Sequence, residues 1–187
     1  VDVQIGRVLA ELEKSGQDEK TIVVLWSDHG YQLGEQGIWG KATNYEMSLR
    51  STLIVAAPGI AAGRTDGLVE LLDLYPTLCE LSSLPAPSGL GGTSFAPLLH
   101  APEGAGKQAV YSQASPQQAT GYSVRTDGYR YTQWQRDGVT VARELYNLHD
   151  DRQETKNLVA TADDKLLREL QSLLLEGHPQ LKTRDNK

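Results

Sequence analysis

The sequence predicts an α/β fold, and three observations support that prediction. Two apolar, β-branched runs, Thr21–Trp26 and Leu53–Ala57, have the composition of strands buried on both faces. Amphipathic helical patterns accompany them in the first half of the chain. From about Ala101 the pattern changes to short strands joined by Asp-Gly turns. We therefore expect a parallel or mixed sheet with helices up to about Ala105, followed by a small antiparallel sheet with one packed helix.

Helical signals surround the two apolar strands. Val3–Lys14 carries apolar residues at helical spacing and is followed by Gly16, so we expect a helix that covers the sheet. A short helical turn at Asn44–Leu49 lies between the strands, and a strand, a crossover and a strand are typical of a parallel pair. With Asp73 as N-cap of the next helix, Pro76 falls in the first turn, where its missing N–H is tolerated.

The second half of the chain predicts hairpins and a final helix. Asp127-Gly128 and Asp137-Gly138 are strong hairpin signals. The runs that alternate aromatic or β-branched residues with polar ones are Ala109–Ser112, Tyr122–Thr126, Tyr129–Gln135 and Val139–Leu145. The last helix is expected over Ala162–Glu176 with Thr161 as its cap, and it should pack on the antiparallel sheet.

Several polar and aromatic residues of this half permit two interpretations. The aromatic residues Tyr122, Tyr129, Tyr131 and Trp134 fit either a sugar-stacking surface or cross-strand packing, and packing is the more common role. The acidic run 150–154 lacks the alternating spacing of a calcium loop, which favours a solvated turn. His149 and His178 show no partner in the sequence and are expected at the surface.

Composition limits the classes of function. The 187 residues are 39% hydrophobic and 22% charged, as in an ordinary globular protein. A net charge of -6 without any Lys/Arg run argues against nucleic acid as a partner. No apolar stretch approaches a membrane span, so a membrane partner is not expected either. The lone Cys79 allows no internal disulfide and leaves the redox compartment open.

Polar side chains follow the first apolar strand directly. In open α/β sheets ligands collect at the carboxyl ends of strands, and here Asp28 and His29 follow the strand, with Gly30 available for a turn. Lys41 comes after a glycine-containing loop that can fold back on the strand end. An acid, an imidazole and a lysine in one cleft suit a divalent metal beside an anionic oxygen of a phosphate or sulfate. An Asp-His pair after a strand is, however, also typical of a turn with a local hydrogen bond.

The motif around these residues resembles a known family. The stretch SDHGYQLGEQGIWGKATNYEMSLRSTLIVAAPG resembles type I sulfatases of the alkaline-phosphatase-like superfamily, especially iduronate-2-sulfatase-like and choline-sulfatase-like members. The likeness continues through VDVQIGRVLAELE before it and through DLYPTLCELSSLPAP, GTSFAPLL, SVRTDGYRYTQW and ELYNLHDDRQETKNL after it. It covers nearly the whole chain.

The resemblance implies roles for individual residues. Asp28 and His29 match the family's second pair of metal ligands, usually to calcium, and Lys41 matches the lysine that contacts the sulfate of the substrate. The metal, Ca²⁺ or another divalent ion, would be shared with an N-terminal part of the protein. Gln36 stands where these relatives commonly have histidine, which puts a role of that position in the substrate pocket in doubt.

The family's catalytic nucleophile is not in this sequence. It is a cysteine in a C-x-P-S-R motif, oxidised to formylglycine, and Cys79 lies in no such motif. We therefore expect the C-terminal portion of a sulfatase, with residues 1–105 completing the catalytic α/β domain and residues 106–187 forming an α+β subdomain. The N-terminal part of the same protein is the expected partner, and this chain alone is expected to be inactive.

The resemblance implies hydrolysis of a sulfate ester, with a sulfated small molecule or glycan as substrate. It suggests a periplasmic, extracellular or lysosomal location. Two alternatives stay open. One is hydrolysis of a phosphonate or phosphodiester on the same superfamily fold. The other is a non-catalytic chain, either inert or a carbohydrate-binding module on the tyrosine-rich sheet.

Overall fold

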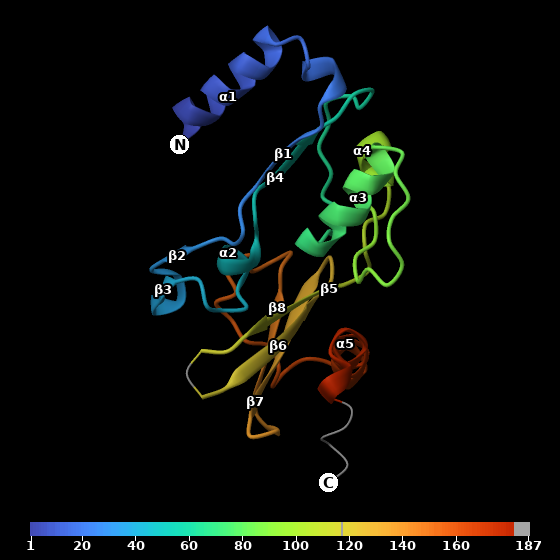
Figure 1. The fold of residues 1–187 in the computed structure, drawn as a ribbon. Helices are drawn as coiled ribbons and strands as arrows, with labels where there is room; N and C mark the ends of the chain where they lie inside the picture. The colour runs from blue at the N-terminus through green and yellow to red at the C-terminus, as the bar shows by residue number, and fades with distance from the viewer. Residues whose placement is uncertain (117, 182–187) are drawn as a thin grey trace. The chain divides into compact units, whose positions relative to one another are not determined.

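The structure is a computed structural model, and it describes residues 1–116 and 118–181 (Figure 1). The chain forms two compact units, each assembled from three stretches. Unit 1 comprises Val1–Ser27, Thr52–Asp66 and Leu72–Gly104, and unit 2 comprises Asp28–Ser51, Gly67–Leu71 and Ala105–Lys187. The expected division of the whole protein into domains, with a boundary between residues 105 and 106, stays a prediction.

Unit 1 contains a two-stranded ladder made of the two predicted apolar strands. Strand β1 (Val23–Trp26) pairs with β4 (Leu53–Ala56), but the pairing is antiparallel, so the expected parallel arrangement of these two strands is wrong. The connection explains the difference. The backbone N–H of Ser27 donates to the carbonyl of Thr52 at 3.0 Å, so the chain leaves β1 and enters β4 at the same end of the ladder. A parallel pair needs a crossover to the opposite end.

The helices of unit 1 are short, and only some of them pack. They are α1 (Asp2–Lys14), η1 (Asp18–Lys20), α3 (Leu74–Leu81) and α4 (Ala96–His100), with the 3-10 turn η3 (Leu71–Asp73) immediately before α3. No residue of α1 is buried, which contradicts the expectation that this helix covers the sheet. Asp73 stands at the N-cap position of α3, but its side chain makes no capping bond to the helix; its buried carboxylate accepts the backbone N–H of Thr93 at 2.8 Å instead.

Unit 2 is organised around a four-stranded antiparallel sheet in the order β5-β6-β7-β8. Its strands are β5 (Val110–Ala114), β6 (Thr120–Arg125), β7 (Tyr129–Arg136) and β8 (Val139–Asn147). Both predicted Asp-Gly hairpins are present. At the second one, Asp137 and Gly138 have φ angles of 51° and 81°, the left-handed pair that a tight hairpin turn needs.

One face of this sheet carries the hydrophobic core, and α5 (Asp164–Gly177) packs on it (Figure 1). The core residues are Ala109, Val124, Tyr131, Leu145, Leu170, Leu174 and Leu181, the last of them in η4 (Pro179–Leu181). The cap of α5 is Asp163 and not the expected Thr161, because the Asp163 carboxylate accepts the backbone N–H groups of Lys165 and Leu166. Tyr122 and Tyr129 pack against this core, which confirms cross-strand packing.

The other face of the sheet contacts residues 28–51, which we call the site segment. It contains β2 (Gln32–Leu33), η2 (Glu35–Gly37), β3 (Trp39–Gly40) and α2 (Glu46–Leu49). Strand alternation separates the two faces. Tyr131 joins the core, whereas its neighbour Arg130 reaches Glu46 of the site segment.

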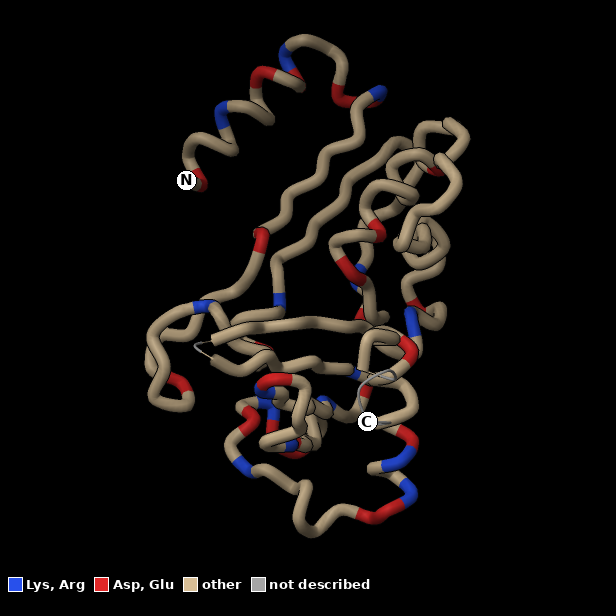
Figure 2. The backbone as a smooth tube through the Cα atoms, turned by 60° about the horizontal axis from the view of Figure 1, so that its bottom comes forward, with Lys and Arg blue, Asp and Glu red and all other residues tan. Residues whose placement is uncertain are grey.

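Charged residues are distributed along the whole chain. Figure 2 shows basic and acidic positions interspersed, without a long run of either sign. Within residues 1–116 and 118–181, no helix combines the length and apolar character needed to cross a bilayer.

Candidate functional site

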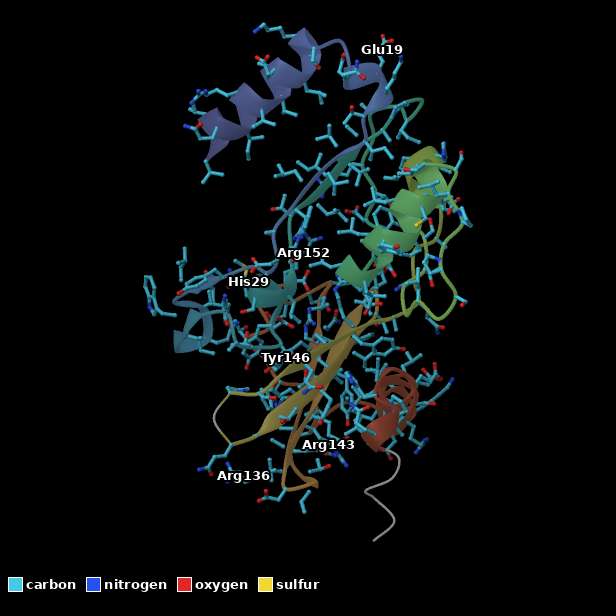
Figure 3. All side chains as sticks on the ribbon, in the orientation of Figure 1. Glu19, His29, Arg136, Arg143, Tyr146 and Arg152 are labelled. Atoms are coloured by element: carbon cyan, nitrogen blue, oxygen red, sulfur yellow. The ribbon has the colours of Figure 1, made fainter. Side chains whose placement is uncertain are left out.

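The structure brings the three predicted site residues together. The Nζ of Lys41 lies 2.6 Å from Nε2 of His29, and the same Nε2 lies 3.3 Å from Oδ2 of Asp28. The imidazole is in the loop beside α2 and β2 (Figure 3). The side chain of Asp28 is 80% exposed and that of His29 is 32% exposed, so the group can accept a ligand from solvent.

Hydrogen bonds fix the tautomer and the orientation of His29. Its Nδ1 lies 2.6 Å from the carbonyl oxygen of Gly30, and because a carbonyl only accepts, Nδ1 carries the proton. In the neutral ring, Nε2 then has a free lone pair, and here it accepts a hydrogen bond from the ammonium of Lys41. Asp28 is fixed from the other side, since its Oδ1 accepts the backbone N–H of His29 at 3.0 Å.

Gly30 is required because the chain approaches α2 closely. Its N–H donates to the carbonyl of Ser48 at 2.8 Å, and a Cβ at this position would lie 2.0 Å from the carbonyl oxygen of Met47. The sequence suggested a glycine for conformational freedom, but Gly30 has no positive φ. The close contact ties the backbone beside His29 to α2.

The loop between His29 and Lys41 is held from inside by Gln32, which is fully buried. Its amide oxygen accepts hydrogen bonds from Thr43 at 2.8 Å and Ser48 at 3.0 Å. Its amide nitrogen donates to the side chain of Gln36 at 2.6 Å. These bonds connect β2, η2 and the residues before α2 into one hydrogen-bonded turn around Lys41.

Gln36, which replaces the family's usual histidine, contributes to the structure of this loop. Its backbone is left-handed, with φ 52°, an unusual conformation for a residue with a side chain. Its amide bonds Gln32 on one side, and on the other donates to the backbone carbonyl of Gln153. Both ends of the Gln36 amide are therefore used within unit 2.

The site segment also packs through a cluster of two phenols and one acid, in which Tyr146 is buried and Tyr45 and Glu144 are partly buried. Tyr45 and Tyr146 meet edge to face with ring centroids 5.9 Å apart. Burial raises the pKa of Tyr45, Tyr146 and Glu144, and hydrogen bonds from Trp134 and Tyr45 partly offset the rise in the pKa of Glu144. Both phenols stay protonated at neutral pH, and their edge-to-face contact packs the site segment against β8.

The donor set fits part of a divalent metal site. Asp28 Oδ2 and His29 Nε2 lie 3.3 Å apart, and in the structure Nε2 accepts a hydrogen bond from the Lys41 ammonium, which a metal bound at Nε2 would displace. Calcium prefers six to eight mostly oxygen ligands. Within the described residues no group of three or more His, Cys, Asp or Glu side chains could hold a metal.

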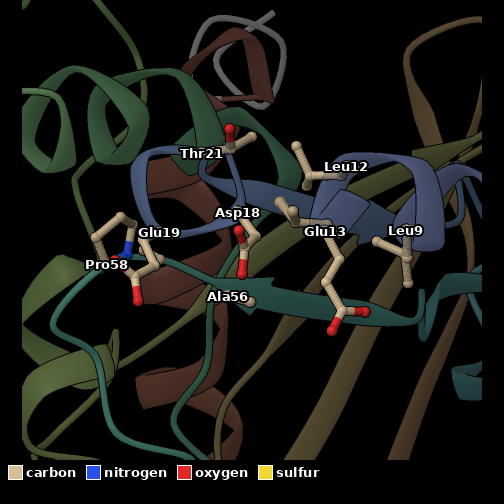
Figure 4. Close-up of a pocket in the computed structure, with 10 residues that line it drawn as sticks. Leu9, Leu12, Glu13, Asp18, Glu19, Thr21, Ala56 and Pro58 are labelled. Carbon is tan, nitrogen blue, oxygen red and sulfur yellow. The ribbon is translucent and has the colours of Figure 1, made fainter. Parts of the chain in front are cut away.

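A separate hollow of about 440 Å³ lies in unit 1 and includes none of the three site residues. Figure 4 shows it between the end of α1 and β4. Apolar side chains such as Leu9 and Leu12 line it together with the carboxylates of Glu13, Asp18 and Glu19. None of the residues that line it is a histidine, a lysine or a cysteine.

Two expectations about polar residues in the C-terminal part are wrong. Glu154, expected in a solvated turn, is buried and bonds Arg130 through a 2.6 Å contact. His178, expected at the surface, is buried between Tyr111 and Tyr122, and burial lowers its pKa. Local sequence could not show either partner.

Comparison with known proteins gives consistent matches. Residues 1–84 match the family model described as Sulfatase. A sulfatase of Formosa agariphila is 37% identical over 158 residues, which cover 84% of this chain and 30% of that protein. An N-acetylglucosamine-6-O-sulfatase of Bacteroides thetaiotaomicron is 33% identical over 99% of this chain and 35% of its own length.

A solved structure agrees with these relatives. It shows a protein in complex with its substrate D-glucosamine-2-N,6-O-disulfate, and it matches with a TM-score of 0.88 at 31% identity, over 100% of this chain and 40% of the other. The α/β fold with a small antiparallel sheet and a packed helix is thus confirmed. The chain spans about a third of the length of the curated relatives it matches. It belongs to the sulfatase family and corresponds to the C-terminal portion of its members.

Proposed function

We propose that the protein containing this chain hydrolyses sulfate esters of a sugar, and that this chain contributes two metal ligands and a sulfate-binding cation. The observation that carries the proposal is the position of His29 Nε2, which lies 2.6 Å from Lys41 Nζ and 3.3 Å from Asp28 Oδ2. Asp28 and His29 belong to the loop that follows β1 in the chain. The sugar is proposed because one relative is a glucosamine sulfatase and another was solved with a sulfated glucosamine.

Asp28 and His29 would hold the metal. Sulfatases generally depend on a divalent metal, and such an ion supplies positive charge that polarises the sulfate oxygens. The bond from His29 Nδ1 to the Gly30 carbonyl prepares Nε2 for this role, because it fixes the ring and removes the proton from the ligating nitrogen. The remaining ligands would come from the N-terminal part of the protein.

Lys41 would bind a sulfate oxygen. A sulfate ester concentrates negative charge on its oxygens as the S–O bond breaks, and an ammonium beside those oxygens stabilises that charge. Because Lys41 Nζ lies 2.6 Å from His29 Nε2 in the structure, Lys41 would leave that nitrogen and turn to the sulfate when the metal binds there. The nucleophile, formylglycine in this family, would lie in the N-terminal part of the protein. In this proposal the N-terminal part of the protein contributes the nucleophile. This chain contributes the ligand pair Asp28 and His29 and the Lys41 cation.

Steady-state kinetics of the full-length protein test the role of Lys41. Lys41→Ala should lower kcat for sulfate release from glucosamine 6-sulfate on the order of 100-fold or more, with an unchanged melting temperature. Lys165→Ala, on the exposed face of α5, is the matched control and should leave turnover unchanged. Normal turnover by Lys41→Ala would contradict the assignment. Faster cleavage of a phosphonate monoester than of any sulfate ester would move the protein to the alternative hydrolase class.

The metal assignment has its own test. Residues 1–187 alone should release no sulfate and should bind calcium weakly in calorimetry, because two ligands are far fewer than calcium requires. Co-expression with the N-terminal part should restore turnover, and Asp28→Ala with His29→Ala should abolish it again. A reconstituted pair that stays active without both side chains, or a tight one-to-one calcium site on residues 1–187, would overturn the assignment.

A further inference from the structure

A buried ion network joins the site segment to the sheet. Arg130 on β7 is 2% exposed, and its Nε lies 2.6 Å from Oε1 of Glu154, which is also 2% exposed. Its Nη2 lies 2.5 Å from Oε2 of Glu46, the first residue of α2. Arg125 on β6 contacts the same Glu46 oxygen at 3.4 Å, so two cations and two carboxylates balance.

Glu154 also holds the beginning of α2 directly. The other carboxylate oxygen of Glu154 accepts the backbone N–H of Glu46 at 2.6 Å, across 108 residues of sequence. The residue before α2, Tyr45, makes no side-chain capping bond, so the carboxylate of Glu154 satisfies an amide that its own neighbourhood leaves open. Asn44 adds a second attachment, because its amide donates to the carbonyl of Gly121 on β6 at 2.9 Å.

Short contacts then lead from α2 to the candidate site. Ser48 of α2 accepts the N–H of Gly30, and the carbonyl of Gly30 in turn orients the imidazole of His29. Ser48 also donates to the buried amide of Gln32, which organises the turn around Lys41. Contacts therefore run from Arg130 to Glu154, from Glu154 to α2, from α2 to Gly30 and from Gly30 to the imidazole of His29.

The turn that carries Glu154 is held in an unusual backbone conformation. Glu154 has a left-handed backbone with φ 55°, which is costly for a residue with a side chain and is kept only where surrounding contacts enforce it. Asp151 enforces it here, since its carboxylate accepts the backbone N–H groups of Thr155 and Lys156 at 2.8 Å. The preceding carbonyl, of Gln153, accepts the amide of Gln36.

Stability alone does not explain such a network. Replacing buried ion pairs by apolar side chains of similar volume is often neutral or stabilising, because charges are costly to remove from water. A buried ion network can instead fix one position of the site segment on the sheet. Here that segment carries Asp28, His29 and Lys41.

We propose that Glu154 and Arg130 are positioning residues, which hold α2 in the register that places His29 and Lys41 at the metal and sulfate site. The proposal rests on the proposed function for the identity of the site. The attachment itself does not depend on that function and can be measured separately.

Amide hydrogen exchange of the full-length protein tests the attachment. Glu154→Gln replaces one carboxylate oxygen by an NH₂ group, which then faces either Arg130 Nε–H or the backbone N–H of Glu46. Because two donors cannot bond each other, one of the two contacts is lost. Exchange at Glu46 and Gly30 should accelerate about 10-fold or more, whereas the paired amides of β7 and β8 should keep their protection. Glu169→Gln, at an exposed pair on α5, is the control. Unchanged exchange at Glu46 and Gly30 in folded Glu154→Gln would overturn the proposal.

Turnover and stability together separate positioning from support. Glu154→Gln should lower kcat/KM for the sulfated sugar about 10- to 100-fold, the typical loss when a group behind a metal ligand is removed. The double variant Arg130→Met with Glu154→Leu should have a melting temperature close to that of the wild-type protein. Its kcat/KM should nevertheless stay as low as that of Glu154→Gln. Recovery of both would show that the pair only stabilises the fold. If wild-type protein cleaves no sulfate ester, the proposed function fails while the exchange measurement still decides the attachment.

A further variant covers the case in which Glu154→Gln does not fold. Glu46→Gln leaves the Arg130–Glu154 pair intact and changes a carboxylate that is 19% exposed. Like Glu154→Gln, it should accelerate amide exchange at Gly30 and lower kcat/KM. Wild-type exchange and wild-type turnover in this variant would overturn the proposal.

Discussion

Units 1 and 2 bury apolar surface in opposite ways. In unit 1, the ladder of β1 and β4 leaves Trp26 53% exposed and Ile54 57% exposed. In unit 2, the sheet and α5 enclose a core in which Leu145 and Leu174 have no exposed surface. Apolar strands without cover are typical of a sheet that continues in a larger structure, whereas unit 2 encloses its own core. The two units therefore respond differently to the same kind of substitution.

Truncating one apolar side chain in each unit should give the largest contrast. Leu174→Ala empties a fully buried site and should lower the free energy of unfolding of residues 1–187 by about 3 kcal/mol. Ile54→Ala removes an exposed side chain and should cost less than about 1 kcal/mol. Urea denaturation measures both. Equal losses would show that β4 is covered in the chain by itself.

Two helical glycines sharpen the contrast at smaller scale. A Cβ on Gly177 of α5 would lie 2.1 Å from the ring of Tyr111, so Gly177→Ala should destabilise the chain by about 1 to 3 kcal/mol. Gly6 of α1 has nothing within 4 Å of such a Cβ, and Gly6→Ala should stabilise the helix by up to about 1 kcal/mol. Opposite signs in thermal unfolding are expected, and a destabilising Gly6→Ala would mean that α1 is packed.

Acid should weaken unit 2 through His178. Burial lowers its folded pKa below the ordinary value of 6.5, against the opposing carbonyls of Ser112 and Ser123. The folded state then binds fewer protons than the unfolded state, so this contribution is present above pH 6.5 and is lost as pH falls through the lowered pKa. Urea denaturation between pH 7.5 and 5 should show the decline. His178→Gln should reduce it, while His149→Gln, at an exposed imidazole, should not.

Local patterns predicted the elements that depend on neighbouring residues. The strand after Thr21 and the strand from Leu53 were placed within two residues, because β-branched runs mark strands directly. Both Asp-Gly turns connect antiparallel strands, because this dipeptide is itself a local hairpin signal. The direction of pairing between β1 and β4 depends on where the 26-residue connection between them returns, and periodicity contains no information about that.

The candidate site was predictable in its residues but not in its support. The order of Asp28, His29 and Lys41 along the chain indicated a shared cleft, and the structure brings them together. Glu154 could not be recognised from its own surroundings, since an acidic turn and a buried ion partner have the same local sequence. Its partners are distant in the chain, and only the pairing of β7 with its neighbours places Arg130 beside it.

The attachments of the site segment also set an order of folding. The hairpins of β6, β7 and β8 close over two-residue turns, whereas the bonds from Asn44 to Gly121, from Glu46 to Arg130 and from Glu46 to Glu154 span 77, 84 and 108 residues. Closing a long loop costs more chain entropy and is slower than forming a local turn. We therefore expect the sheet to form first, and Lys41 and His29 to reach their places late, when the segment that carries them docks on the finished sheet.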